Sequence, residues 1–460
     1  MDARVTVRSA ACLAALAWCF VGACGSGGEE APRPAHNSVQ GTTQNSATRV
    51  DEAAARPLLE LPAEGRRTVV WISIDGVRSD YLSRGDFPTL HRLQREGAFS
   101  RQLVPVFPSL TFPSHVSQAT GVRPGVHGIV ANVFYDRQTR EHYYYPPDGR
   151  LLDAEPIWLT ATRQGIRTAV SDWTLSHGQH GAVRTAYHGE RFDKRLSDQQ
   201  RLEQLLKAWE NDTAQPEPLR LLMGYMEGPD GTGHQYGPDS PEIAKKLKQV
   251  DRDLEQFLQQ ALALWQRTRK AGDAFYLLVT TDHGMAKVER LVNLDALAGL
   301  EGETGVASAF SGNVAHVFFD DPHIAARQPQ RVETLLKRVR QHDFAKAYRQ
   351  DELPPRWQLA HPTRTGDVVI VLEPGYAFGN RIPGLLAAPA EVAGPQGMHG
   401  YDPQTNEQML GYLVLWRAET PLGGVDLGRV DALRLHPTVA ALLGIEPADK
   451  AQASPLVRQR

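Results

Sequence analysis

The chain has few cysteines, no long apolar run and little excess charge, and each shortage removes a class of protein. Its 460 residues include only three cysteines, which all lie within the first 24 positions. The remainder therefore holds no disulfide, no thiolate metal site and no cysteine nucleophile. The formal net charge of -3 gives no reason to expect nucleic acid as a partner. Hydrophobic residues at 41% and charged residues at 22% exclude a disordered chain and one with several membrane spans.

The amino-terminal segment has the pattern of a lipoprotein signal peptide. A basic start precedes an apolar stretch from Ala10 to Phe20, which is about half the length of a membrane span. The next four residues, Val-Gly-Ala-Cys, resemble a bacterial lipobox. We therefore expect residues 1–23 to be removed and Cys24 to carry a lipid, the alternative being an ordinary secretory signal with a chance cysteine. The low apolar content of residues 24–58 predicts a tether to the cell envelope, at the periplasmic face or the outer membrane.

The folded body contains three apolar runs that are typical of buried parallel strands. They span residues 68–74, 219–226 and 274–281, and their apolarity is continuous rather than alternating. A strand that is covered on both faces shows this pattern, because helices pack on each side of a parallel sheet.

Helical patterns alternate with these runs. Residues 197–209 repeat leucine and tryptophan at helical spacing, and Ser240-Pro241 opens a longer amphipathic helix that Gly272 can end. A short helix is expected over residues 437–443. The alternation predicts an α/β domain over residues 59–450, followed by a tail over 451–460. Residues 300–395 are rich in proline and glycine, and we interpret them as a smaller subdomain.

Each apolar run is followed by a carboxylate. Asp75 and Asp282 come directly after two of the runs, and Asp230 follows the third after a short loop. Ligands of open α/β sheets bind beyond the carboxyl ends of the strands, so these acids can converge on one crevice. Clustered carboxylates repel one another unless a cation neutralises them. His234 and His283 lie close to two of the acids, and a mixed nitrogen and oxygen set suits zinc better than manganese or iron.

Several longer strings occur in a fixed order and together resemble the nucleotide pyrophosphatase/phosphodiesterase family of the alkaline phosphatase superfamily. The resemblance covers about residues 66–446, and the strings that carry it are Ile74–Gly76, Thr111–His115, Thr120–Asn132, Pro229–Pro238, Thr281–Met285 and Met398–Asp402. It implies an alkaline-phosphatase-like α/β fold with a mostly parallel central sheet and helices on both faces. It also implies a hydrolase of phosphodiester or phosphoanhydride bonds, with a small substrate such as a nucleotide.

The resemblance assigns site residues by position. One zinc ion is expected on Asp230, His234 and His399, and a second on Asp75, Asp282 and His283, which would also activate Thr111. Thr111 is the implied nucleophile, and its phosphorylated form is the implied intermediate. A threonine hydroxyl is almost fully protonated at neutral pH, and a metal ion lowers its pKa. Asn132 would hydrogen-bond a non-bridging phosphate oxygen, together with a backbone N–H near Thr111.

The sequence gives less information about substrate specificity than about the reaction. Phe112 and Tyr225 stand where family members that bind nucleotides stack the base, although both can simply wall the pocket. A choline-phosphodiester or lipid phosphodiesterase therefore remains an alternative. The string Asp172 to Ser176 departs from the Trp-Pro-Gly-Ser-like string of related sequences, which leaves contacts to the distal part of the substrate open.

Three further alternatives differ in the chemistry that they need. A phosphate-monoester phosphatase of the same superfamily requires extra positive groups, and Lys194-Arg195 lacks the Lys-x-Arg spacing. A sulfatase requires a cysteine or serine nucleophile, whereas this string has Thr111. A tethered binding protein that has lost catalysis would not need the full set of implied ligands, which is present here.

Overall fold

The structure is a computed structural model, and it describes residues 59–61, 65–320, 328–379, 385–451 and 453–459. The expected signal peptide, Cys24 and the tether lie outside these residues. Within the described part of the chain, no helix is long and apolar enough to cross a membrane.

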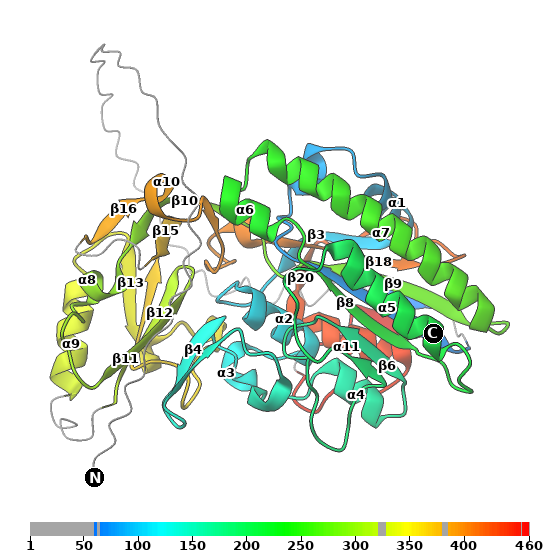
Figure 1. The fold of residues 1–460 in the computed structure, drawn as a ribbon, viewed down its shortest axis with the longest axis horizontal. Coiled ribbons are helices and arrows are strands. Elements are labelled where there is room, and N and C mark those ends of the chain that lie inside the picture. The colour runs from blue at the N-terminus through cyan, green and yellow to red at the C-terminus, as the bar shows by residue number, and fades with distance from the viewer. Residues whose placement is uncertain (1–58, 62–64, 321–327, 380–384, 452, 460) are drawn as a thin grey trace, which may run out of the picture. The chain divides into compact units, whose positions relative to one another are not determined.

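A nine-stranded sheet forms the centre of the main part of the chain (Figure 1). Its strand order is β19-β3-β18-β9-β2-β8-β6-β7, with β20 also paired to β3. The strands from β9 to β7 run parallel, whereas β18 is antiparallel to β3 and β9. The bounds are β2 Arg67–Ile74, β3 Ala98–Val104, β6 Thr168–Ser171, β7 Tyr187–His188, β8 Leu221–Met226, β9 Ala274–Thr280, β18 Gly411–Arg417, β19 Val425–Asp426 and β20 Arg429–Asp431. The three expected strands are thus the three adjacent central strands.

Helices cover both faces of this sheet, because successive side chains of a strand point to opposite sides. Val70 and Ile72 of β2 pack into one core under α1 (Pro88–Glu96), α5 (Asp198–Asp212) and α7 (Pro241–Thr268). Val69 and Trp71 of the same strand pack into a second core under α2 (Thr111–Thr120), α4 (Ile157–Arg163) and α11 (Leu435–Leu443). Figure 1 shows α7 and α5 on one side of the sheet and α4 and α11 on the other. The expected α/β fold with helices on both faces is confirmed.

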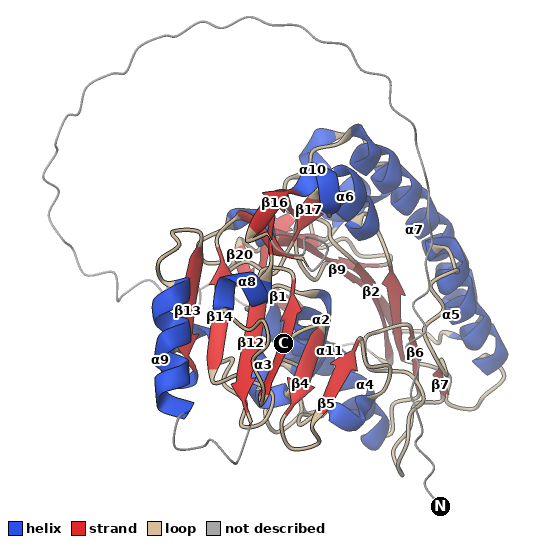
Figure 2. Cartoon of the chain, turned by 60° about the vertical axis from the view of Figure 1, so that its left-hand side comes forward, coloured by secondary structure: helices blue, strands red, loops and turns tan. Residues whose placement is uncertain are grey.

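A smaller lobe follows β9 and has its own core. Its antiparallel sheet has the order β11-β12-β14-β13, and α8 and α9 contribute leucines and valines to the same core. In Figure 2, α9 lies against this sheet. A second small sheet pairs β10 with β15, β16 and β17. The bounds are β10 Ala286–Val292, α8 Leu294–Ala298, β11 Val306–Ser311, β12 Val314–Phe319, α9 Gln328–Val339, β13 Ala345–Arg349, β14 Val368–Leu372, β15 Gly375–Phe378, β16 Ala387–Pro389, α10 Ala390–Ala393 and β17 Gly397–Met398.

Short elements connect these parts. A hairpin of β4 (Val133–Asp136) and β5 (Glu141–Tyr144) follows α3 (Pro124–His127), and α6 (Asp230–Tyr236) follows β8. The hairpin is joined to the lobe through Ser311, whose hydroxyl accepts the backbone N–H of Val133 over 3.0 Å. The 3-10 helices are Tyr81–Arg84, Gly149–Leu151, Gln350–Glu352, Pro355–Trp357, Glu407–Met409 and Ala432–Arg434.

Several expected boundaries differ from the structure, and three of these differences have a clear cause. The long helix ends at Thr268 rather than next to Gly272, because a turn closed by the Asp273 N–H on the Lys270 carbonyl leads into β9. The lobe begins at Ala286 instead of residue 300, because β10 belongs to its second sheet. The residues expected as a tail include β21 (Val457–Gln459), which pairs in parallel with β1 (Leu59–Leu61) and buries Val457 in the second core.

Candidate active site

The candidate site lies at the carboxyl ends of the three central strands. β2 runs parallel to β8 on one side and to β9 on the other, so their carboxyl ends share one edge. Asp75 follows β2, Asp282 follows β9, and Asp230 is the first residue of α6 after β8. The Gly76 N–H donates to Oδ1 of Asp282 over 3.1 Å, which joins two of the loops directly. The structure therefore brings together the three carboxylates that the strand ends predicted.

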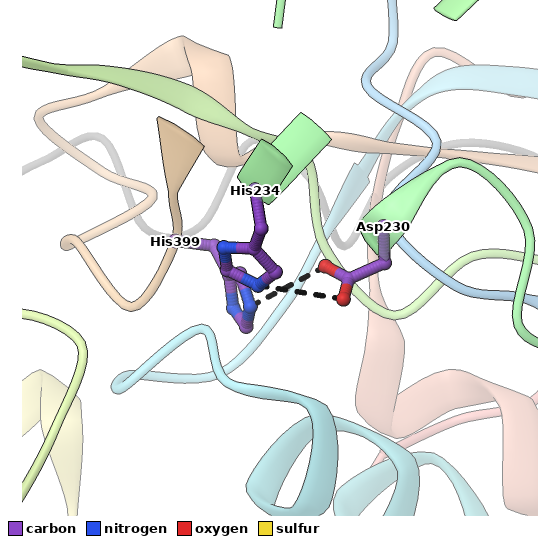
Figure 3. A group of neighbouring side chains, drawn as sticks. All are labelled: Asp230, His234 and His399. Carbon is purple, nitrogen blue, oxygen red and sulfur yellow. Dashed lines mark ion pairs between the residues drawn. The ribbon is translucent and has the colours of Figure 1, made fainter. Parts of the chain in front are cut away.

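An outer group is formed by Asp230, His234 and His399 (Figure 3). Asp230 and His234 lie one turn apart on α6, and His399 follows β17. The Nε2 atoms of His234 and His399 lie 3.4 and 3.5 Å from the carboxylate oxygens of Asp230. Their Nδ1 atoms donate to backbone oxygens of Gly397 and Ser109, over 2.7 and 3.0 Å. This second bond orients each ring and leaves Nε2 available as a metal ligand.

The expected inner group contains Asp75, Asp282 and His283, and donor atoms of Asp75 and His283 also lie within 4.8 Å of a carboxylate oxygen of Asp230, so that Asp230 adjoins both groups. His283 Nε2 lies 3.3 Å from Oδ1 of Asp75 and 3.0 Å from Oδ2 of Asp282. All three side chains are almost fully buried. The three carboxylates of the two groups each keep one buried oxygen without a hydrogen-bond partner among the described residues, namely Asp75 Oδ1, Asp230 Oδ1 and Asp282 Oδ2.

The charges and the burial of the two groups favour the binding of a cation. Burial raises the pKa of Asp75 well above its ordinary value, and the nearby charges of Asp282 and Asp230 raise it further. Burial opposes a proton on His234, yet the charge of Asp230 lifts its pKa to about 9. Buried carboxylates with orphaned oxygens beside imidazole nitrogens fit a divalent metal ion, which removes the like-charge repulsion. The nitrogen and oxygen donor set of each group fits zinc.

Thr111 stands beside the inner group at the first position of α2. Its Oγ1 lies 3.3 Å from Nε2 of His283. The backbone N–H of Phe112 donates to Oδ1 of Asn132 over 2.8 Å, which leaves the amide NH₂ of Asn132 as the donor of that side chain. The backbone donor expected beside Thr111 is therefore already bonded within the protein. A helix N-terminus with an amide donor beside a hydroxyl is an arrangement that favours a negatively charged phosphoryl group.

The aromatic side chains differ in part from the expectation. Phe112 is half-buried, and its ring meets that of Tyr145 edge to face at 5.5 Å. Tyr225 is only 8% exposed, and its hydroxyl donates to Oδ2 of Asp75 over 2.7 Å. This side chain therefore supports a carboxylate of the inner group instead of offering an open stacking surface. Phe192, which is 40% exposed, lies 6.2 Å from the Tyr225 ring.

Phe192 and Tyr145 were not among the substrate-binding residues expected from the sequence. Phe192 is a lone aromatic in a charged stretch, and the Arg201 guanidinium lies 4.2 Å from its ring centre. Tyr145 is 58% exposed and adopts a left-handed backbone with φ of 46°. That conformation is unusual for an aromatic residue. An aromatic residue within a charged run was the signal that the sequence offered for Phe192. Such a signal does not identify the neighbours of the ring in the fold.

Behind the site, His115 links three of its elements. Its Nδ1 lies 2.9 Å from the backbone oxygen of Thr111 and 3.3 Å from Oδ2 of Asp282. Its Nε2 lies 2.8 Å from the hydroxyl of Ser73 in β2. His115 therefore connects β2, the start of α2 and the loop of Asp282.

The comparisons with known proteins agree with this geometry. A model of the type I phosphodiesterase / nucleotide pyrophosphatase family matches residues 69–402. An uncharacterised pyrophosphatase/phosphodiesterase of Schizosaccharomyces pombe is 30% identical over 346 residues, which are 73% of this chain and 68% of that protein. The bis(5'-adenosyl)-triphosphatase of Homo sapiens is 27% identical over 391 residues, or 82% and 78% of the two chains.

The solved structures show the same fold. Murine ectonucleotide pyrophosphatase/phosphodiesterase 5, solved as an inactive variant in complex with AMP, superposes with a TM-score of 0.70. The two chains are 23% identical, and the match covers 84% of this chain and 96% of the murine chain. The human protein of the same name superposes with a TM-score of 0.69. The alkaline-phosphatase-like fold is thereby confirmed.

Proposed function

The chain belongs to the type I phosphodiesterase / nucleotide pyrophosphatase family, and from this membership we propose that it is a two-zinc enzyme with Thr111 as its nucleophile. The single observation that carries the proposal is the position of Thr111. Its hydroxyl lies at the start of α2, 3.3 Å from His283, beside two groups of carboxylates and histidines. The inner group would hold one zinc ion and the outer group the other.

The chemistry proceeds in two displacements. Thr111 Oγ attacks phosphorus, the bond from phosphorus to the leaving oxygen breaks, and that oxygen departs with a proton. Water then attacks the phospho-threonine, which releases the phosphate product and restores the hydroxyl. Bound zinc supplies the positive charge that lowers the pKa of an alcohol and offsets charge on phosphate oxygens. The amide NH₂ of Asn132 would donate to the non-bridging oxygens in both steps, and the dipole of α2 would favour their negative charge.

The substrate class is a small phosphodiester or phosphoanhydride, and a nucleotide is the candidate that we favour. Phe112, Tyr145 and Phe192 offer partly exposed rings on which a base can stack. Murine ectonucleotide pyrophosphatase/phosphodiesterase 5, which shares the fold, was solved with AMP. Choline phosphodiesters undergo the same reaction and carry choline in place of a nucleoside as an ester group of the phosphate, so they are the second candidate.

A ratio of two rates tests the proposal. Protein from residue 59, loaded with zinc, is compared on bis-p-nitrophenyl phosphate and p-nitrophenyl phosphate, each with and without a chelator. We expect the diester to be hydrolysed faster and the chelator to abolish both reactions. A faster monoester would place the enzyme on the phosphatase branch, and chelator-resistant turnover would contradict the metal site. Nucleotide and choline diesters are then compared by kcat/KM.

We also propose that Cys24 anchors the enzyme to a membrane of the cell envelope. The support is the lipobox-like string that ends at this residue and the apolar-poor segment that follows it. Metabolic labelling with a fatty acid should mark the full-length protein and not Cys24→Ala, which should also leave the membrane fraction. Labelling of the variant would contradict the anchor.

A further inference from the structure

Arg78 lies where the loops of the main sheet meet behind the candidate metal ligands. It is three residues beyond Asp75, and its side chain is 4% exposed. Its Nη1 donates to the backbone oxygen of Met285 over 3.0 Å, two residues beyond His283. Its Nη2 donates to Oδ1 of Asp239 over 2.7 Å, in the segment that follows α6. One guanidinium therefore joins the loop of Asp75, the loop of His283 and the segment that follows His234.

Met285 joins two of these segments a second time, through its side chain. Gly233 lies in α6 between Asp230 and His234. A Cβ atom added at Gly233 would lie 3.0 Å from Cε of Met285, so the thioether packs directly against α6. Arg78 thus holds the backbone of a residue whose side chain supports the helix of the outer group.

The charge of Arg78 is balanced locally. Asp80 accepts from Nε over 2.7 Å, and Asp239 is the second carboxylate. Arg84 bonds the same two carboxylates, and its Nη1 lies 2.7 Å from Oδ1 of Asp239. Arg84 is 39% exposed, however, and its hydrogen bonds within the described chain end on these two aspartates. The two arginines share their carboxylates and differ in the bond to Met285, which makes Arg84 a matched control.

We propose that Arg78 is a positioning residue that sets the spacing between the inner and outer groups, and with it the affinity for the metal pair. A guanidinium is a planar fork that can donate to Asp80, Asp239 and the Met285 carbonyl at the same time. Lysine would keep the charge but lacks the fork. The inference rests on the proposed two-metal site.

The test measures zinc directly. Wild type, Arg78→Lys and Arg84→Lys are titrated with zinc against a competing chelator, and Tm is recorded with and without zinc. We expect Arg84→Lys to match wild type. Arg78→Lys should bind zinc more weakly by about 10-fold, the lower end of what loss of a direct partner of a metal ligand costs, because Arg78 acts through Met285 and Asp239. Its rise in Tm on adding zinc should shrink accordingly.

The outcomes separate the inference from the proposed function. Wild type that binds no zinc would overturn both. If wild type binds zinc and Arg78→Lys binds it equally well, only the inference fails, even when the metal-free Tm has fallen. Should Arg78→Lys not fold, Asp239→Ala provides the second variant, because it removes the acceptor that links Arg78 to the segment after α6 and keeps Arg78. Zinc affinity unchanged in Asp239→Ala would likewise overturn the inference.

Discussion

The main sheet and the smaller lobe contribute unequally to the candidate site. Loops of the main sheet carry every candidate metal ligand except His399, which follows β17 where the lobe ends. The inner group therefore comes from the main sheet alone, and its side chains are at most 3% exposed. In the outer group, Asp230 is 18% and His234 is 29% exposed. The greater exposure of the outer group comes from Asp230 and His234 on α6, because His399, which follows the lobe, is itself only 4% exposed.

The main part of the chain and the lobe also pack directly against each other. A shared core joins Phe107 and Leu110 of the main part to Val314 and Val369 of the lobe. Leu110 directly precedes Thr111, so the lobe packs against the start of the helix that carries the proposed nucleophile. The lobe thus supports the site through packing as well as through His399.

The largest expected effect is that of replacing Thr111, the first residue of α2, which packs on the main sheet. Thr111→Ala removes the attacking oxygen and should lower kcat by more than about 1,000-fold, as removal of a nucleophile does. Zinc content should stay near the wild-type value, because the six histidine and aspartate ligands remain. Single-turnover assays and metal analysis check both points. Near-normal turnover in this variant would show that another group attacks phosphorus.

Substitution of one ligand from each region separates the two groups. His399→Ala removes the ligand that follows the lobe, and Asp282→Asn removes a carboxylate of the inner group. Each should lose about one equivalent of zinc, with a decrease in kcat/KM of about 100-fold or more. Because Asp282 accepts the Gly76 N–H and lies within 3.3 Å of both His115 and His283, Asp282→Asn should also lower the Tm of the zinc-loaded protein more than His399→Ala does. Equal losses of Tm would mean that these contacts of Asp282 add no stability beyond that of the bound metal.

Substitution of Tyr225 should perturb the inner group less than substitution of one of its ligands. Tyr225→Phe removes the bond to Oδ2 of Asp75 and keeps the ring. We expect about 10-fold weaker zinc binding, at the lower end of what a lost supporting bond costs, with KM for a nucleotide nearly unchanged. A large rise in KM with normal zinc affinity would instead show that Tyr225 contacts the substrate.

The smallest expected effect is a pH dependence of the free energy of unfolding. One buried histidine in each region contributes to it. Burial lowers the pKa of His436 in α11 and of His316 in β12 to about 4, below the ordinary 6.5. The unfolded chain then binds the proton more tightly, so stability is complete above about pH 6.5 and falls toward pH 4. Each histidine adds at most about 1.4 kcal/mol per pH unit.

Denaturant unfolding of the metal-free protein between pH 7 and 4.5 measures this slope. His436→Gln and His316→Gln should each flatten it, within one cooperative transition, because the two regions share a core. Two separate transitions, with His316→Gln acting only on the first, would show that the lobe unfolds by itself.

Local pattern in the sequence was enough to predict much of the main sheet. β2, β8 and β9 appear as continuous apolar runs, since each is covered on both faces. The helix start at Ser240-Pro241 and the helix end at Gly444 follow from backbone preferences of single residues. The lobe was harder to predict, because its start at Ala286 depends on which strands β10 pairs with. Pairing between distant segments leaves no local pattern.

The candidate ligands were predicted by position, but the roles of the aromatic side chains were not. Tyr225 and Phe192 are alike in the sequence as aromatic residues near motifs. One is buried against Asp75 and the other lies exposed over Arg201. That difference arises when β8 is placed beside β2, which turns the Tyr225 hydroxyl toward Asp75.

The sequence by itself determined the family, the candidate ligand residues and the carboxylates at the strand ends, because short strings and apolar runs are local properties. Only the tertiary structure decided that Asp75, Asp282 and His283 form the closed group while His399 completes the open one. It also decided that Arg78 bonds the carbonyl of Met285 and the carboxylate of Asp239. Such contacts join residues far apart in the chain, and folding alone sets their distances.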